Sequence, residues 1–333
     1  MDDYVTPLLL PIQETNLYGY IDPAGSWVIP PRFALAFPFY EGLALVSVPR
    51  RSLFIRRVNR YGYIDETGRL VIPPRYQEAF SFSEGLAAVI PSRSLRGRWG
   101  YIDRHGHPVI RPRYSLAGGF FEGLARVRRG RLWGFINQQG QFVIKPRFDS
   151  AHDFSRGMAA IKDTMSGKWG YINPAGKWAI APRFDWAEPF SDGLARVNSG
   201  GKWGFIDPPG NYILKPVFDY AANFSEGLAP VNVERRFDEI FHTPIGGKWG
   251  YVDKQGRGAI DAHFDEAQPF SGGLARVKIY GKWGFIDSAG KIVIDPRFTD
   301  ASNFIGGVAM VWVGRERFLI DREGKRIPIR PGV

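Results

Sequence analysis

The chain of 333 residues carries a formal net charge of +11 at pH 7 and contains no cysteine. The lack of cysteine excludes disulfide scaffolds, thiolate catalysis and zinc–thiolate sites. The sequence has no run of about 18 apolar residues, and its start, Met1-Asp2-Asp3, lacks the basic character of a secretory signal. We therefore expect a soluble, cytoplasmic protein without a membrane span, with secretion as the alternative.

One motif recurs along the chain at intervals of 34 to 46 residues. An aromatic residue is followed by glycine, a second aromatic residue, isoleucine, an acid or amide, and a later glycine. The first glycine of the motif falls at Gly19, Gly62, Gly100, Gly134, Gly170, Gly204, Gly250 and Gly284, and a degenerate ninth copy covers residues 317 to 324. This period is typical of arrays in which each repeat buries its apolar face only against its neighbours.

No linker or change of composition interrupts the repetition. We predict one all-β array over residues 1–333, built from about nine three-stranded antiparallel β-meander repeats. The repeats are expected to start near residues 6, 43, 86, 124, 158, 194, 228, 274 and 308.

The first repeat departs from the later copies at one position. The apolar segment from Leu8 to Ile12 can form its first strand, and residues 18 to 22 can form its second. Tyr18 takes the place of tryptophan, as Tyr61 does in the second repeat. We expect the array to begin with a whole repeat.

Positive charge is concentrated between residues 50 and 131. This segment holds seventeen arginines, no lysine and six acids, a net charge of +11 that equals the charge of the whole chain. Nine of these arginines fall in loops between the first and second strands of successive repeats: Arg50, Arg51, Arg56, Arg57, Arg93, Arg96, Arg128, Arg129 and Arg131. Because equivalent loops of stacked repeats lie along one edge, we predict a continuous arginine-rich edge.

Arginine's planar guanidinium suits bidentate contact with carboxylate or phosphate. The predicted edge therefore favours an acidic protein or another polyanion as partner, with nucleic acid as a further alternative. The competing interpretation is a solvated edge that only keeps the protein soluble. Motifs typical of nucleic-acid readers, such as helix-turn-helix, zinc finger or RRM signatures, are absent from the sequence.

The second strand of each repeat is clearest at Trp169-Gly170-Tyr171-Ile172-Asn173. Alternation places the two rings on one face and Gly170 and Ile172 on the other. Glycine weakens the interior of a strand, so its recurrence beside a bulky ring predicts that a neighbouring backbone or side chain packs closely there.

The Asp/Asn-x-x-Gly motif after this strand predicts a tight hairpin turn, because the acid accepts from backbone two residues on and glycine supplies a positive φ. Its acids are Asp22, Asp65, Asp103, Asp207, Asp253, Asp287 and Asp321. Calcium needs about six to eight oxygens from converging ligands, whereas each turn supplies one carboxylate. We interpret these acids as turn residues and predict no metal site.

The third strand is expected to end at a proline, as at Pro182, because proline cannot donate to a ladder. The chain then crosses to the next repeat, whose first strand is Leu194 to Val197. Phe190 is expected to anchor this crossover in the core.

A long insertion at residues 233 to 245 occupies the first hairpin loop of a later repeat. Insertions in repeat arrays often mark a binding face. Its candidate contact residues are Arg235, Arg236, Phe237 and Phe241. The apolar residues could dock a partner or fold back onto the edge, and we favour the second interpretation.

The end of the chain also reads as a whole repeat, with strands expected at residues 308 to 313, 318 to 321 and 326 to 329. Closed propellers commonly complete one blade from both termini. Two whole terminal repeats, each shorter than the about 40 to 45 residues of a WD-type blade, favour an open solenoid or superhelix. A closed β-propeller is the alternative.

These residues resemble the WG-repeat family, whose pattern is Gly-Lys-Trp-Gly-Phe-Ile-Asp-x-x-Gly, preceded by Phe-Ser-Glu-Gly-Leu-Ala-x-Val. The cleanest copy runs from Phe190 to Val197 and then from Gly201 to Asp207. The resemblance covers nearly the whole chain. It implies a β-rich repeat protein of bacterial type, and it brings no shared activity, catalytic residue or cofactor.

The search for catalytic residues gives no positive result. His105 and His107 flank a turn glycine and are expected to be exposed. Acids recur before the Gly-Leu-Ala strands, at Glu41, Glu84, Glu122, Asp192 and Glu226. A glycosidase needs two differently tuned carboxyl groups in one cleft, whereas these acids hold equivalent positions in different repeats. No phosphate loop, dinucleotide fingerprint or nucleophile elbow occurs, so we expect no enzyme activity and no cofactor.

Two functions remain. The first is a non-enzymatic interaction scaffold that presents the arginine-rich edge, and in part the insertion, to an acidic macromolecule. The second is a carbohydrate or cell-envelope binding module that uses exposed aromatic residues such as Trp27, Trp178 and Trp186. The first predicts strong salt dependence of binding and the second predicts weak salt dependence.

Overall fold

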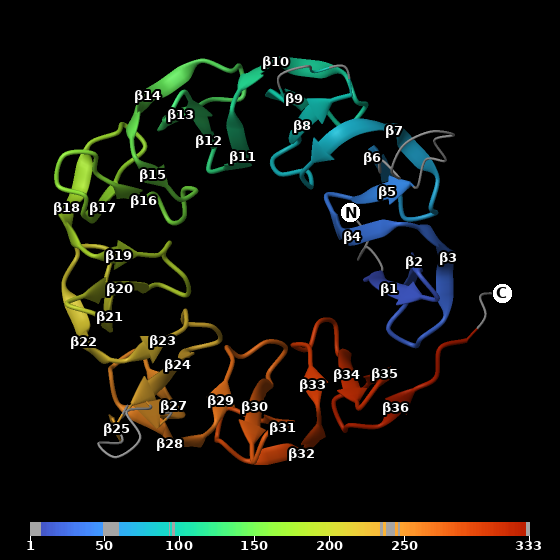
Figure 1. The fold of residues 1–333 in the computed structure, drawn as a ribbon, viewed down its shortest axis with the longest axis vertical. Helices are drawn as coiled ribbons and strands as arrows, with labels where there is room; N and C mark the ends of the chain where they lie inside the picture. The colour runs from blue at the N-terminus through green and yellow to red at the C-terminus, as the bar shows by residue number, and fades with distance from the viewer. Residues whose placement is uncertain are drawn as a thin grey trace, which may run out of the picture. The chain divides into compact units, whose positions relative to one another are not determined.

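The computed structural model describes residues 8–48, 60–92, 94, 97–233, 236–237, 244–245 and 247–330. The described residues form β-strands, turns and connecting segments (Figure 1), which confirms the predicted all-β array. No helix long and apolar enough to cross a membrane is found among them. The chain divides into two compact parts, which are described separately: the first part is 1–159, 173–177 and 329–333, and the second part is 160–172 and 178–328.

The first part contains three sheets of antiparallel strands. The first sheet consists of β1 (Leu10–Glu14), β2 (Leu17–Ile21) and β3 (Trp27–Phe33). The second, of seven strands, comprises β4 (Leu35–Tyr40), β5 (Leu43–Val48), β6 (Arg60–Ile64), β7 (Leu70–Ala79), β8 (Ala87–Pro91), β9 (Trp99–Ile102) and β10 (Pro108–Tyr114). The third comprises β11 (Leu116–Phe121), β12 (Leu124–Arg129), β13 (Leu132–Ile136) and β14 (Phe142–Phe148), and β15 (Ser150–Ala151) follows it.

The second part continues the same pattern. After β16 (Ala159–Lys162), which begins at the boundary, β17 (Trp169–Ile172) pairs antiparallel with β18 (Trp178–Phe184). Two four-stranded sheets follow: β19 (Trp186–Ala187), β20 (Ala195–Ser199), β21 (Lys202–Ile206) and β22 (Tyr212–Phe218), then β23 (Tyr220–Ala221), β24 (Leu228–Val233), β27 (Lys248–Asp253) and β28 (Gly258–Phe264). Two more complete the part: β29 (Glu266–Ala267), β30 (Ala275–Ile279), β31 (Lys282–Ile286) and β32 (Ile292–Phe298), then β33 (Asp300–Ala301), β34 (Ala309–Val313), β35 (Glu316–Ile320) and β36 (Arg326–Ile327).

Each four-stranded sheet contains the three predicted strands and one further strand, which has six residues in β11 and two residues in the other sheets. In the sheet β19–β22, the extra strand β19 pairs through Trp186 with Asn198 and through Ala187 with Val197. The sequence did not predict this strand, because two residues are too few to show alternation.

The glycine of the aromatic–glycine motif lies against backbone, as predicted. A Cβ at Gly204 would lie 2.5 Å from the Leu214 carbonyl oxygen and 2.7 Å from the Pro216 nitrogen. The register between β21 and β22 shifts at Gly204, because Trp203 pairs with Phe218 whereas Phe205 pairs with Leu214. The third strand is therefore bent over the glycine of the second strand.

The acid after the second strand forms the predicted turn. The Asp207 Oδ1 atom accepts from the backbone N–H of Asn211 at 2.6 Å, and the N–H of Gly210 donates to the Asp207 carbonyl at 2.9 Å. Gly210 has a φ of 95°, which favours glycine. The carboxylate is occupied by its own turn.

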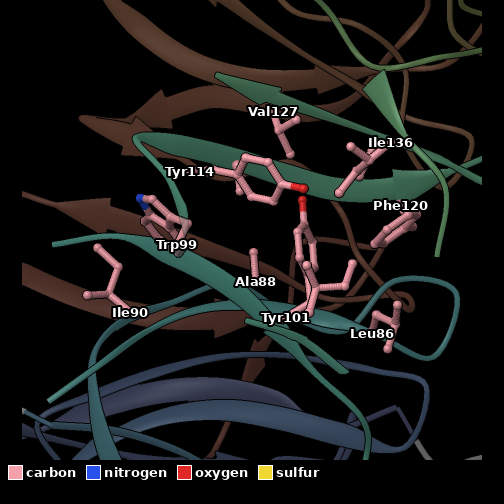
Figure 2. Packing of buried hydrophobic residues seen from close by; sticks show 12 residues of the cluster. Leu86, Ala88, Ile90, Trp99, Tyr101, Tyr114, Phe120, Val127 and Ile136 are labelled. Carbon is pink, nitrogen blue, oxygen red and sulfur yellow. The ribbon is translucent and has the colours of Figure 1, made fainter. Parts of the chain in front are cut away.

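The core lies between successive sheets, as the first part shows in Figure 2. Tyr101 of β9 and Phe120 of β11 have ring centroids 5.0 Å apart, and the Tyr101 hydroxyl donates to the Gly118 carbonyl at 2.9 Å. Burial raises the pKa of Tyr101. In the second part the predicted anchor Phe190 is buried, and its ring lies 5.1 Å from that of Tyr171. One aromatic pair per repeat therefore holds each crossover in the core.

The acids before the Gly-Leu-Ala strands join one repeat to the next. The Glu122 carboxylate accepts from the Gly157 N–H at 2.8 Å, and Glu122 has a φ of 54°. The equivalent pairs are Glu41 with Gly85, Glu84 with Gly123, Asp192 with Gly227, and Glu226 with Gly273. These carboxylates serve as connectors between repeats.

One pairing within the first part was not predicted. Ser26 forms a parallel bridge with Arg330, whose N–H donates to the Gly25 carbonyl at 2.9 Å. The sequence shows no motif at this end of the chain that would indicate such a bridge.

Candidate functional site

Three hairpins of the first part carry the predicted arginine-rich loops. They join β5 to β6, β8 to β9 and β12 to β13, and their registers are equivalent: Val46 pairs with Gly62, Val89 with Gly100, and Val127 with Gly134. The three loops therefore leave the same end of their strand pairs. Six of the predicted arginines lie outside the described residues: Arg50, Arg51, Arg56, Arg57, Arg93 and Arg96.

The third hairpin shows how these loops present arginine. Arg129 pairs with Leu132 at the end of the ladder, and Gly130 turns the chain with a φ of 65°. Arg129 and Arg131 are exposed on this tight turn, and Arg128 is half-buried beside it. The structure thus places these three predicted residues together.

Other arginines of the same segment serve the fold. Arg75 and Arg113 donate to the carbonyl oxygens of Gly106 and Gly140, at 2.7 and 2.5 Å, and so join successive repeats. Arg126 forms an ion pair with Asp153 at 2.9 Å. Burial raises the pKa of the Asp153 carboxyl, against the opposing effect of Arg126. The charge of +11 is therefore divided between arginines that hold repeats together and arginines on hairpins.

Three hairpin lysines of the second part pair with acids. Lys168, Lys202 and Lys248 each precede the tryptophan of the motif, and each forms an ion pair with the aspartate 17 residues further on: Asp185 at 2.5 Å, Asp219 at 2.6 Å and Asp265 at 2.5 Å. Lys168 and Lys248 hold the pKa values of Asp185 and Asp265 below their ordinary range. These three hairpin cations are thus neutralised in place, whereas Lys282, which precedes Trp283, has Thr299 at the aspartate position.

The first part lacks this neutralisation at two hairpins. Arg60 and Arg98 hold the lysine position, but Gln77 and Ser115 hold the aspartate position. Gln77 donates to the Ser92 carbonyl at 2.9 Å, and the Ser115 hydroxyl donates to the Arg128 carbonyl at 3.0 Å. Each neutral side chain thus supports the next hairpin without supplying a charge.

We define the basic hairpin edge as the described residues Arg60, Arg98, Arg128, Arg129 and Arg131. Sequence reasoning missed Arg60 and Arg98, which stand at the ends of strands rather than in loops. The signal that could have found them is the Lys–Asp spacing of 17 residues in later repeats, which is broken at both positions.

The ion pairs of the second part give a prediction for acid stability. A lowered pKa in the folded state contributes stability above the ordinary carboxyl value of 3.8 and loses it as the pH falls through the lowered pKa. The double variant Asp185→Asn, Asp265→Asn should be less stable at pH 7 and should lose less stability on acidification than the parent. Urea unfolding at pH 7 and about pH 3 measures this. Equal acid losses in the two proteins would show that these carboxylates do not contribute.

The insertion forms a second, smaller candidate surface. β25 (Arg236–Phe237) and β26 (Pro244–Ile245) pair as an antiparallel ribbon, with Arg236 opposite Ile245. Arg236 and Phe237 are described by their backbone alone, and Arg235 and Phe241 lie outside the described residues. Docking of a partner and folding back onto the edge both stay hypotheses.

Exposed aromatic side chains occur in the second part. Trp178 and Trp186 are 39% and 43% exposed, whereas Trp27 of the first part is half-buried. The Trp186 Nε1–H donates to Glu188 at 2.9 Å, which fixes the orientation of the ring. Tyr220, 53% exposed, lies between Trp203 and Trp249 at centroid distances of 6.1 and 5.9 Å.

The histidines near the turn glycine are exposed, as predicted. His107 Nδ1 lies 3.2 Å from Asp103, whose carboxylate also accepts from the N–H groups of His105 and His107. Within the part of the chain that the structure describes, no cluster of three or more His, Cys, Asp or Glu residues is arranged to hold a metal ion.

Comparison with known proteins shows one family and a set of similar folds. A family model described as WG containing repeat matches residues 18–48, 61–90, 99–132, 133–164, 169–203, 203–237, 249–283 and 283–313. No curated protein sequence matches the chain. Solved structures with a similar fold include dihydro-heme d1 dehydrogenase NirN in complex with DHE, with a TM-score of 0.46 and 12% identity over 90% of this chain and 75% of that chain.

Two further solved structures are similar at the same level. The β-propeller domain of the Trilobed protease from Pyrococcus furiosus has a TM-score of 0.41 and 11% identity, over 89% of this chain and 98% of that chain. Kluyveromyces lactis Hsv2p has a TM-score of 0.39 and 14% identity, over 60% of this chain and 71% of that chain.

Proposed function

The chain belongs to the WG containing repeat family, and we propose that it is a non-enzymatic binding module. Its repeats present the basic hairpin edge, which binds an acidic protein. Repeat arrays of this kind form extended surfaces, since each repeat adds an equivalent loop to one side. The described connector acids and turn acids are engaged in holding the array. Recognition is then left to the hairpins.

The observation that carries this proposal is the missing pair of aspartates. In the second part three of the four lysines before a motif tryptophan have an aspartate 17 residues on, and the fourth, Lys282, has Thr299 there. In the first part Gln77 and Ser115 stand there, beside an arginine instead of a lysine. A cation paired within its own chain has little left to offer a partner, whereas an unneutralised guanidinium can form charge-assisted bidentate bonds with a carboxylate.

An acidic protein suits this edge better than single-stranded nucleic acid does. Single-strand readers combine basic grooves with aromatic platforms for the bases. On the hairpin from Arg129 to Leu132, the described residues are arginine, glycine and leucine. Aromatic stacking is therefore not offered by that hairpin, and nucleic acid becomes the alternative outcome of the test.

The test is affinity capture at about 50 mM and about 500 mM salt, where the screening length differs several-fold. The purified partners should be lost at high salt, and they should resist nuclease treatment; sensitivity to nuclease would identify nucleic acid instead. Replacing Arg129 and Arg131 of the basic hairpin edge by alanine, together with the predicted loop arginines, should remove the same partners; these loop arginines are Arg50, Arg51, Arg56, Arg57, Arg93 and Arg96. An unchanged set of partners after that replacement would end the proposal.

A second variant tests the same idea without removing any arginine. Gln77→Asp together with Ser115→Asp restores the acids of the second part beside Arg60 and Arg98. We expect weaker capture of the same partners at low salt. Asp149, which already stands at the equivalent position after Leu132, provides the matched control as Asp149→Asn, which should not weaken capture.

A carbohydrate-binding function is the second candidate, and one observation favours it. Trp186 is exposed while its ring is held by Glu188, and Tyr220 is exposed between two tryptophans. Fixed, exposed rings stack on sugar faces with little loss of side-chain entropy. This function requires binding to insoluble polysaccharide that persists at high salt and is lost in Trp186→Ala.

A further inference from the structure

A cavity of about 510 Å³ lies in the first part, beside the basic hairpin edge. Arg60, Arg75, Tyr76, Pro91, Ser92 and Pro108 are among its lining residues. Arg60 begins β6 at the foot of the first arginine-rich loop, and Pro91 and Ser92 end β8 at the foot of the second. The cavity therefore opens where two of the basic hairpins start.

Two other repeats close the equivalent place with an aromatic ring of their own. The same register joins Ile102 to Pro108, Ile136 to Phe142, and Ile206 to Tyr212. Phe142 lies edge-on to Tyr114, with centroids 6.1 Å apart and planes at 85°.

Tyr212 lies in the same way against Phe184, at 6.2 Å and 86°. At the site beside Tyr76, Pro108 supplies no such ring. The cavity thus includes the place that an aromatic ring fills in those two repeats.

The guanidinium group on the polar side of the cavity is held in place by hydrogen bonds within the protein. Arg75 lies over the Tyr76 ring at 5.5 Å, donates to the Gly106 carbonyl at 2.7 Å and to the Tyr76 hydroxyl at 3.1 Å. In the second part, where Tyr212 fills the equivalent place, the Arg183 guanidinium lies over the rings of both Phe184 and Tyr212, at 4.9 and 5.9 Å. A ring that entered beside Tyr76 would meet the same edge and the same kind of guanidinium.

The positive charge around the cavity determines which residues can flank a ring that enters it. Arg60 and Arg75 line it, and none of its described lining residues is acidic. A ring flanked by carboxylates would therefore be attracted, whereas one flanked by lysine or arginine would be repelled.

We propose that this cavity binds one aromatic side chain of an acidic peptide segment on the partner protein, which takes the place that Phe142 and Tyr212 fill in other repeats. This inference rests on the proposed function and narrows its partner class to acidic segments with an aromatic anchor. Buried aromatic anchors dominate the energetics of many interfaces, with charges around them guiding approach.

The probes are two labelled peptides, Glu-Glu-Glu-Phe-Glu-Glu-Glu and its counterpart with alanine in place of phenylalanine. Fluorescence anisotropy at low salt should show the phenylalanine peptide binding about tenfold tighter, as expected for burial of a ring. Pro108→Phe fills the cavity as Phe142 does in its own repeat. This variant should bind the phenylalanine peptide only as tightly as the alanine peptide, and its affinity for the alanine peptide should equal that of the parent protein.

Two controls keep the outcome clear. Pro108→Ala leaves the cavity open and should retain the preference for phenylalanine. Gly258→Phe introduces a ring at the same register in the second part, where Val252 pairs with Gly258 and an added Cβ meets nothing within 4 Å, and should have no effect.

If both peptides bind the parent protein equally in a salt-dependent way, the cavity inference is wrong and the basic edge stands. If neither peptide binds, the proposed function fails as well. An undiminished preference in Pro108→Phe, with the fold intact by circular dichroism, would also contradict the cavity inference.

Discussion

Replacing Gly204 by alanine is expected to lower the free energy of unfolding by about 3 to 5 kcal/mol. The new Cβ would lie 2.5 Å from the Leu214 carbonyl oxygen and 2.7 Å from the Pro216 nitrogen. Both atoms belong to backbone that is held in a ladder on either side, so neither can move away without breaking the pairing of Trp203 with Phe218 or of Phe205 with Leu214. Urea unfolding, followed by tryptophan fluorescence, measures the loss.

The matched control is Gly258→Ala in the same part of the molecule. Gly258 opens a third strand, its φ lies outside the left-handed region, and an added Cβ meets nothing within 4 Å. This variant should change stability by less than about 1 kcal/mol, because alanine also restricts the unfolded chain. Equal losses in the two variants would show that close approach is not what glycine provides in the motif.

Reversing two charges at the third hairpin is expected to weaken binding of a labelled polyglutamate about thirtyfold at low salt. The variant is Arg129→Glu, Arg131→Glu, and both side chains are exposed on a tight turn. Each exposed charge pair contributes at most about 1 kcal/mol, so losing two gives about 2 kcal/mol, which corresponds to this factor. The difference from the parent should shrink as salt is added, because these charges face solvent.

A control with the same change in net charge is available in the second part. Arg315 follows Gly314 on the hairpin from Val313 to Glu316, as Arg131 follows Gly130, and Lys291 is exposed on a turn. The variant Arg315→Glu, Lys291→Glu should bind polyglutamate within about threefold of the parent. If both reversals weaken binding to the same degree, the protein responds to net charge alone and the basic hairpin edge has no special role.

The parts of the fold that could be predicted are those that local chemistry repeats in every copy. The turn at Asp207 depends on an acid and a glycine three positions apart in the chain, and the close approach at Gly204 depends on the absence of a side chain. Phe190 was recognised as an anchor because an aromatic residue recurs at that position. Repetition made each of these signals visible several times in one sequence.

The candidate site was only partly predictable, because the role of each arginine depends on residues far along the chain. Arg113 and Arg129 look alike in the sequence, yet Arg113 donates to the Gly140 carbonyl and Arg129 is exposed at a hairpin. Arg98 became a candidate only when its equivalent, Lys168, was seen paired with Asp185. The cavity beside Pro108 needed coordinates, since it is recognised by comparison with two repeats in which a ring fills the equivalent place.

The carboxylate connectors between repeats have a consequence for how such a chain can change in length. Glu122 reaches the backbone of the following repeat at Gly157, and Glu84 reaches Gly123 in the same way. A duplicated repeat would bring both its own acid and its own receiving glycine, so the two new junctions would be satisfied at once. Gene duplication could therefore lengthen the array without further mutation, and the charges on individual hairpins could then diverge while every junction stayed intact.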